Sequence, residues 1–200
     1  MVVVKLGGSL QSTIYIKKWI RAIELKFNSS FILIFGGGKH ADKIRLAQKE
    51  KNYDDYRAHQ LAIKAMKKLT IDHFAYLKNF SKIDSLDTIK NNQKKRKLLV
   101  WLPSIEDVDD LKVSKNWDST SDSIALAIAN KTNSPLLLVK SVKFNSKKYL
   151  NSYFLKEDLL DKDFLKYKFI KKQNISIVSK YNFYKLKKIC NDFSKKNTIY

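Results

Sequence analysis

All five glycines of the chain lie in two short stretches, each of which directly follows a run of β-branched or aromatic residues. They are Gly7 and Gly8 in the first stretch and Gly36, Gly37 and Gly38 in the second. Because glycine has no side chain, its backbone N–H groups can come close to an anion. Lys5 stands two residues before the first stretch, and an ammonium at such a loop can neutralise a transferring phosphoryl group. The pattern predicts two phosphate-binding turns, although each alone is also typical of a tight turn into a helix.

A run of small polar residues, Asp118–Ser123, follows Trp117 and is the second pattern that could carry chemistry. It directly precedes the apolar stretch Ile124–Ala129. The apolar stretch predicts a buried helix, and serine, threonine or aspartate before a helix is typical of an N-terminal cap. Capping explains one such residue but not the whole run. Asp122 therefore has two interpretations: it caps the helix, or it faces a phosphate site, where it holds lysines in place or coordinates Mg²⁺.

These residues stand at the ends of the secondary-structure elements that the sequence predicts. Short apolar runs predict strands over residues 2–6, 31–35, 98–102, 136–140 and 175–179. Apolar residues at helical spacing predict helices over residues 14–27, 41–51, 53–76, 124–129, 156–171 and 183–193. Residues 80–97 show no clear element. The order predicts an α/β fold with parallel strand pairing, and ligands of such sheets bind beyond the carboxyl ends of the strands.

Composition indicates one compact unit, because the chain has 200 residues of which 44% are hydrophobic. We expect a single domain over residues 1–200. No apolar run approaches the roughly 18 residues that cross a bilayer, so we expect no membrane partner. Cys190 is the single cysteine and cannot form an intramolecular disulfide. A cytoplasmic protein is the expectation that follows.

The formal charge of +21 is typical of proteins that bind nucleic acid, but the kind of basic residue argues against such a partner. Lysine supplies most of the charge, whereas specific readers of bases and phosphates favour arginine. We interpret the basic cluster Lys94–Lys97 as a solvated loop. His59 and His73 lack a third ligand at metal-site spacing, and we interpret both as packing or surface residues.

Together these motifs resemble the amino acid kinase family. The start is similar to the VxKLGGS pattern of that family, Gly36–Ala41 to its GGG-x-x-A pattern, Thr120–Asp122 to a TSD before a buried helix, and Leu136–Val142 to a strand that runs into a nucleotide-contacting turn. The resemblance implies a three-layer αβα sandwich with a mainly parallel central sheet. It also implies transfer of the γ-phosphoryl group of ATP, with Mg²⁺, to a small carboxylate, carbamate or phosphate acceptor.

The resemblance assigns a role to each matched position. It implies two catalytic residues, Lys5 and Asp122, of which Asp122 orients the lysines. Nucleotide-binding residues implied by it are Gly7, Gly8, Ser9, Lys140 and Ser141. Acceptor-binding residues implied by it are Gly36, Gly37, Gly38, Asp118, Thr120 and Ser121. It implies no protein metal ligand.

The sequence departs from the family pattern in its last third. Lys140–Lys143 replaces an acidic, glycine-containing turn similar to TDVDG, and the glycines usual near the C-terminus are missing. A second catalytic lysine is also implied, and the sequence does not choose it among four candidates. They are Lys147, Lys148, Lys156 and Lys162.

Within the family, the segment Trp117–Ala125 and the short chain look most similar to the small kinases of methanofuran biosynthesis. Those enzymes phosphorylate an (aminomethyl)furanmethyl phosphate to its diphosphate, in one-carbon metabolism. The alternatives are a kinase of UMP, isopentenyl phosphate or an acylated amino acid, and a non-catalytic member that only binds nucleotide. Apolar helices commonly pair such chains, so a homo-oligomer is expected.

Overall fold

The structure is a computed structural model that describes residues 1–200 except 12, 27–28, 90–97, 144–158, 167–173 and 195–200. Six parallel strands form one sheet in the order β3-β4-β2-β1-β5-β6. They are β1 (Val2–Leu6), β2 (Phe31–Phe35), β3 (Ser81–Ile83), β4 (Leu98–Trp101), β5 (Leu136–Lys140) and β6 (Ile175–Ser179). The predicted α/β fold with a parallel sheet is confirmed. The strand β3 lies in the stretch where the sequence showed no element, and three half-polar residues are too few to give a pattern.

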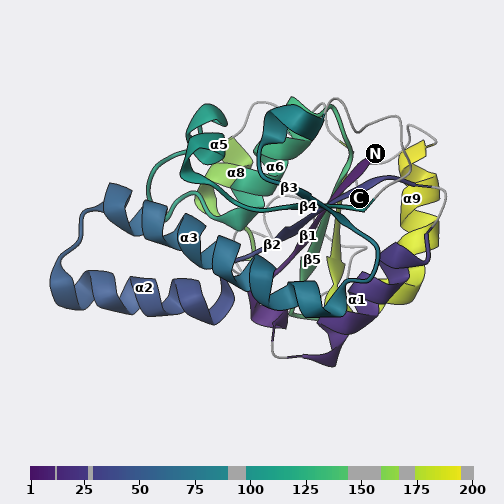
Figure 1. The fold of residues 1–200 in the computed structure, drawn as a ribbon, viewed down its shortest axis with the longest axis horizontal. Helices are drawn as coiled ribbons and strands as arrows, with labels where there is room; N and C mark the ends of the chain where they lie inside the picture. Colours follow the sequence, from purple (N-terminus) through teal and green to yellow (C-terminus); the bar gives the residue numbers. More distant parts are fainter. Residues whose placement is uncertain (12, 27–28, 90–97, 144–158, 167–173, 195–200) are drawn as a thin grey trace.

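Helices cover both faces of this sheet (Figure 1). They are α1 (Ile14–Glu24), α2 (Gly38–Lys51), α3 (Asp55–His73), α5 (Ile105–Asp110), α6 (Ser121–Lys131), α8 (Lys162–Lys166) and α9 (Leu186–Ser194). Short 3₁₀ helices are η1 (Gly8–Leu10), η2 (Phe74–Tyr76), η3 (Leu86–Thr88) and η5 (Lys180–Lys185). One apolar core contains side chains of α1 and α9, and the other contains side chains of α3, α5, α6 and α8. The three layers of the expected sandwich are therefore present.

Several predicted helix boundaries were wrong. The helix expected over residues 41–51 begins at Gly38, because the third glycine already belongs to its first turn. The helix expected over 183–193 is divided between the end of η5, a 3₁₀ helix that ends at Lys185, and α9, which begins at Leu186. Of the helix expected over 156–171, residues 159–161 are not helical and α8 covers five residues. Its other parts and the cluster Lys94–Lys97 lie outside the described residues.

Side-chain alternation along the strands decides which residues reach which core. Val2, Val4 and Leu6 of β1 pack toward α1 and α9, and Val3 packs toward α6. With a period of two, Lys5 follows Val3 onto the side of the sheet that α6 covers. A strand that is otherwise fully apolar thus sends one charged side chain into the layer of α6.

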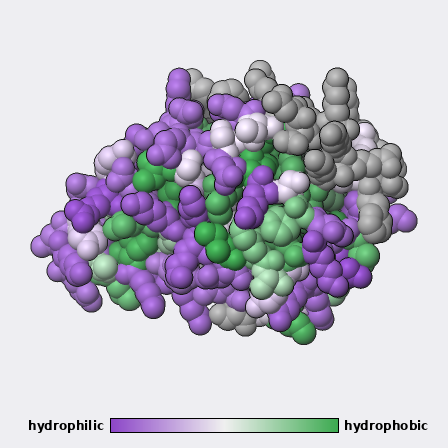
Figure 2. Space-filling model, viewed as in Figure 1, coloured by the Kyte–Doolittle hydropathy of each residue, from purple (hydrophilic) through white to green (hydrophobic). Residues whose placement is uncertain are grey.

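The α2–α3 pair projects from the body of the sandwich as a helical hairpin (Figure 1). Hydrophilic residues cover most of the hairpin in Figure 2, and α2 buries none of its side chains. Within the part of the chain that the structure describes, no helix has the length and apolar character needed to traverse a bilayer.

Candidate functional site

The two glycine loops lie side by side because β1 is hydrogen-bonded to β2 on one edge and to β5 on the other. The backbone N–H of Gly7 donates to Val139 of β5 at 3.0 Å, and that of Gly36 donates to Leu6 of β1 at 3.0 Å. The carboxyl ends of three neighbouring strands therefore meet at one edge of the sheet. The site expected beyond the strand ends has its backbone frame here.

The loops contact one another through their backbones. A Cβ atom added to Gly8 would stand 2.1 Å from the backbone nitrogen of Gly38, and one added to Gly36 would stand 2.7 Å from that of Gly8. Among the five glycines, Gly38 alone has a positive φ, of 50°. Close backbone approach, and not only access for an anion, therefore explains the concentration of glycine at these two strand ends.

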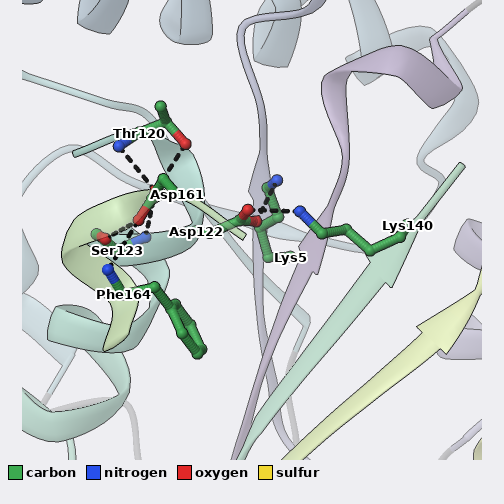
Figure 3. Close-up of polar contacts among 7 residues, drawn as sticks. All are labelled: Lys5, Thr120, Asp122, Ser123, Lys140, Asp161 and Phe164. Carbon is green, nitrogen blue, oxygen red and sulfur yellow. Dashed lines mark hydrogen bonds and ion pairs between the residues drawn. The ribbon is translucent and has the colours of Figure 1, made fainter. Parts of the chain in front are cut away.

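A buried carboxylate lies between two lysines at this edge (Figure 3). Lys5 Nζ donates to Asp122 Oδ1 at 2.7 Å, and Lys140 Nζ donates to Asp122 Oδ2 at 2.5 Å. Lys5 and Asp122 are each 4% exposed, so these charges depend on each other for compensation. Lys140 follows Leu138 by one period along β5, and Asp122 stands in the first turn of α6. Three elements, β1, α6 and β5, thus bring together Lys5, Asp122 and Lys140, which we call the triad.

Burial and charge act in opposite directions on the pKa values of this triad. For Asp122, burial alone raises the pKa, but the charges of Lys140 and Lys5 outweigh it and lower the pKa to about 2. For Lys5, burial is the largest effect, and it lowers the pKa despite the opposing attraction of Asp122. Asp122 is ionised at neutral pH and holds the charges of both lysines at one point.

Of the expected second catalytic lysines, Lys147, Lys148 and Lys156 lie outside the described residues. Lys162 pairs with Asp118 at 3.1 Å, and its side chain is 77% exposed. It is Lys140 that binds Asp122 together with Lys5. The sequence analysis expected Lys140 only to contact the nucleotide. The alternation of Leu136, Leu138 and Lys140 along β5 was the signal that could have identified it.

A carboxylate that the sequence analysis missed, Asp161, lies at the start of α6 (Figure 3). It accepts hydrogen bonds from the backbone N–H and the hydroxyl of Thr120, at 2.8 and 2.7 Å. It also accepts from the N–H and the hydroxyl of Ser123. No sequence motif marks Asp161, which lies in a lysine- and aspartate-rich stretch 41 residues after Thr120.

A cavity of about 280 Å³ opens at these groups. Of the predicted site residues, those that line it are Lys5, Gly8, Ser9, Gly37, Gly38, Thr120, Ser121, Asp122 and Lys140. Gly7 and Gly36 are buried in the adjoining loops. Asp118 is not part of the cavity wall and pairs with Lys162 and Lys166 of α8, and these lysines lower the pKa of its carboxyl. Ser141 follows β5 and is half-buried.

The helical hairpin and the loop before α6 provide the rest of the cavity wall. Trp117 donates from its indole nitrogen to Gln48 at 2.5 Å, and the guanidinium of Arg45 lies 4.4 Å from the centre of the Trp117 ring. His59 is buried on the same wall, and its Nε2 has no hydrogen-bond partner among the described residues. The same holds for the hydroxyl of Ser119. Unsatisfied buried polar atoms beside a cavity are suited to a ligand.

The ring of His59 is held in the neutral state by its surroundings. Burial is the largest effect and lowers its pKa, although Asp109 and the backbone of Asn116 act in the opposite direction. The Asn116 backbone is the partner on one side of the ring, and Nε2 on the other side is buried without a partner among the described residues. A residue interpreted from sequence as ordinary packing therefore lies on the cavity wall.

The donor groups fit a magnesium ion that arrives with a nucleotide better than one held by the protein. Both oxygens of Asp122 already bind lysines. Within the described ranges, no three His, Cys, Asp or Glu side chains gather as a metal site. Mg²⁺ in phosphoryl-transfer sites keeps several waters and binds substrate phosphates together with few carboxylates.

Comparison with known proteins gives one sequence relative and several solved structures. The chain is 32% identical over 131 residues to the [5-(aminomethyl)furan-3-yl]methyl phosphate kinase of Methanocaldococcus jannaschii, covering 64% of this chain. It spans 59% of the length of that relative. A scan against models of protein families finds no match.

The solved structures agree over most of the chain. The UMP kinase from Ureaplasma parvum has a TM-score of 0.60 at 14% identity, covering 98% of this chain and 95% of its own. An isopentenyl phosphate kinase has a TM-score of 0.57 at 15% identity, covering 92% and 95%. At such identities the likeness shows the fold alone, and it confirms the fold that the sequence resemblance implied.

Proposed function

We propose, from the premise that this chain has the amino acid kinase fold, that it is a kinase of a small molecule and transfers the γ-phosphoryl group of ATP. One observation carries the proposal: the buried Asp122 carboxylate holds Lys5 and Lys140 beside two contacting glycine loops. Phosphoryl transfer needs positioned reactants and neutralised charge more than covalent chemistry from the protein. One carboxylate between two ammonium groups leaves one net positive charge at the cavity.

Each part of the site has a role in this reaction. Lys5 and Lys140 neutralise the transferring phosphoryl group, and Asp122 orients both lysines. The phosphates of ATP bind to the loop of Gly7, Gly8 and Ser9. Lys140 and Ser141 contact the nucleotide from the other side of β1. Mg²⁺, when bound with the nucleotide, neutralises phosphate charge.

The acceptor occupies the side of the cavity formed by Gly36–Gly38, the loop before α6 and the helical hairpin. We propose a phosphate ester with a small ring and an amine, as in (aminomethyl)furanmethyl phosphate, which becomes its diphosphate. Its phosphate oxygen forms a bond to the γ-phosphorus of ATP while the bond to the bridging oxygen breaks, and ADP leaves. The similarity to the M. jannaschii enzyme supports this choice. The ring of Trp117 and the free Nε2 of His59 also fit an aromatic body and an N–H donor.

The test is ADP release measured with MgATP and a panel of acceptors. The panel contains (aminomethyl)furanmethyl phosphate, UMP, isopentenyl phosphate and an N-acetylated amino acid. We expect turnover with the furan phosphate, and a fall of about 10²-fold or more in kcat for Lys5→Ala and Asp122→Asn. Lys43→Ala, an exposed lysine of α2, is the matched control and keeps its turnover.

Other outcomes of the panel point elsewhere. Turnover with UMP but not with the furan phosphate would show that the protein is a kinase whose acceptor is UMP. ATP that raises the melting temperature without ADP release under any acceptor would indicate a nucleotide-binding protein without turnover. The replacement of an acidic, glycine-containing turn by Lys140–Lys143 is the observation that keeps this second candidate.

A further inference from the structure

We infer that Asp161 is a positioning residue of the site, whose carboxylate fixes the first turn of α6 and thereby holds Asp122 between Lys5 and Lys140. The inference rests on the proposed kinase function for its kinetic consequence. Its structural basis is independent of that function, because it lies in hydrogen bonds between Asp161 and the helix that carries Asp122.

The contacts of Asp161 use both of its carboxylate oxygens (Figure 3). Oδ2 accepts from the Thr120 N–H at 2.8 Å, the Thr120 hydroxyl at 2.7 Å and the Ser123 N–H at 3.1 Å. Oδ1 accepts from the Ser123 hydroxyl and from the N–H of Phe164 at 2.9 Å. One side chain thus binds residues on both sides of Asp122.

These contacts replace the cap that α6 lacks within its own sequence. The first N–H groups of a helix have no partner inside the helix, and an N-cap side chain usually accepts from one of them. Thr120 stands at the N-cap position, but its hydroxyl donates to Asp161. The carboxylate of Asp161 takes over that function from a distant segment and also places a negative charge at the positive end of the helix dipole.

Position is what this cap controls, because Asp122 is the second residue of α6. Without a cap the first helical turn frays, and both lysine contacts of Asp122 begin in that turn. The charge of Asp161 also favours the protonated form of Lys5, where it is the smallest of the effects that oppose the lowering of the Lys5 pKa by burial. The same carboxylate therefore supports the geometry and the charge of the triad.

The segment that carries Asp161 is fastened to the loop before α6 by further contacts. The N–H of Asp163 donates to the backbone oxygen of Asp118 at 2.9 Å, and Lys162 pairs with the Asp118 side chain. Through these contacts residues 161–166 bind both the loop before α6 and the first turn of α6. We therefore expect Asp122 to keep its contacts with both lysines only while residues 161–166 pack against the start of α6.

The test compares Asp161→Asn with Asp163→Asn. Asp163 lies two residues away and is buried, whereas Asp161 is half-buried, and the side chain of Asp163 pairs with Lys166 instead of binding α6. The contact of Asp163 with Asp118 is made by its backbone N–H, which the asparagine variant keeps. A displacement of about 1 Å at a reacting group can cost ~10²-fold in rate. We expect kcat of Asp161→Asn, at saturating ATP and acceptor, to fall roughly 10- to 100-fold with both KM values nearly unchanged. Asp163→Asn keeps kcat near that of the wild type.

A double-variant comparison separates positioning from general destabilisation. If Asp161 acts through Asp122, adding Asp161→Asn to Asp122→Asn lowers the residual kcat little further, because the two changes damage one unit. A multiplicative loss in the double variant would overturn the inference. So would a kcat of Asp161→Asn within about twofold of the wild type.

Two further measurements keep the inference testable if the first variant folds poorly or no turnover is found. Ser123→Ala removes one donor and leaves Asp161 in place, so a folded protein with reduced kcat is expected. Hydrogen exchange of the amides of residues 121–124 requires no substrate. It is expected to be faster in Asp161→Asn and unchanged in Asp163→Asn, and unchanged exchange in both would overturn the inference even if the kinase reaction itself is not found.

Discussion

At the scale of single residues, the central feature is that one carboxylate serves two lysines. Asp122 neutralises one of the two charges, so one positive charge remains for an incoming phosphate, and burial strengthens its effect. The electrostatic role of each lysine depends on this shared partner. Replacing one lysine therefore does more than remove a contact, because it also cancels the remaining net charge.

Lys140→Met tests this charge balance directly. We expect kcat to fall by about 10²- to 10³-fold, with a smaller change in the dissociation constant of ATP, since the charge matters most as the phosphoryl group transfers. Lys143→Met changes an exposed lysine three residues later and serves as control. Measured by ADP release and ATP titration, an unchanged kcat in Lys140→Met would remove this lysine from the reaction.

In the proposed reaction, we expect His59 to contact the acceptor, because it lines the cavity. We expect His59→Phe to raise the KM for an amine-bearing acceptor about tenfold, because a buried hydrogen bond to a charged donor is lost. The KM for ATP should not change. The control substrate is the same acceptor with a methyl group in place of the aminomethyl group, and its KM should be equal for both proteins. An equal loss with both acceptors would assign His59 to packing.

Sequence reasoning could identify some of these residues and not others. Lys5 and Asp122 stand in recognisable motifs, and the structure brings them together. Lys140 was visible as a residue, but its contact with Asp122 depends on side-chain alternation and strand order, which a motif does not contain. Asp161 was not visible, because its partners lie about 40 residues away and no local pattern expresses that proximity.

At the scale of elements, the two glycine loops behave as one unit, because the start of η1 packs on the start of α2. Gly8→Ala would place a methyl group against the backbone of Gly38, which cannot yield as a flexible side chain would. We expect a loss of about 1–3 kcal/mol in the free energy of unfolding and weaker ATP binding. Ser9→Ala alters an exposed neighbour and should leave the stability unchanged, as measured by denaturant titration. Equal stability of Gly8→Ala and wild type would show that the loops can separate.

The elements that the sequence predicted well are the long or strongly apolar ones. β1, β2, β5 and β6 were predicted at their observed bounds, because at least four of the five residues of each are buried. The short elements β3 and α5 were missed, since three and six residues contain too few repeats to reveal a period. The start of α2 was missed because glycine is a poor helix former, and here it begins the helix for the sake of backbone contact.

At the scale of the whole molecule, the triad makes stability depend on acid pH. The pKa of Asp122 is about 2 in the folded chain against an ordinary value of 3.8. A carboxyl with a lowered pKa stabilises the fold above its unfolded pKa, and this stabilisation is lost as the pH falls toward the folded pKa. The free energy that Asp122 contributes is therefore constant above about pH 5 and declines between about pH 4 and 2.

Denaturant titrations of wild type and Asp122→Asn at several pH values check this dependence. We expect the stability difference between the two proteins to shrink by about 2 kcal/mol between pH 5 and pH 2, because asparagine does not titrate. Asp110→Asn, an exposed aspartate of α5, should show no comparable trend. A difference that stays constant with pH would mean that the lysines do not stabilise the ionised carboxylate.

The central place of β1 in the sheet has a consequence for how the protein is made. Val2–Leu6 leaves the ribosome about 130 residues before its neighbour β5. At about 5–20 residues per second, the nascent chain waits on the order of ten seconds before this edge is paired. During that interval one edge of an apolar strand has no partner and can pair with other chains. We therefore expect the nascent chain to bind chaperones that act at the ribosome.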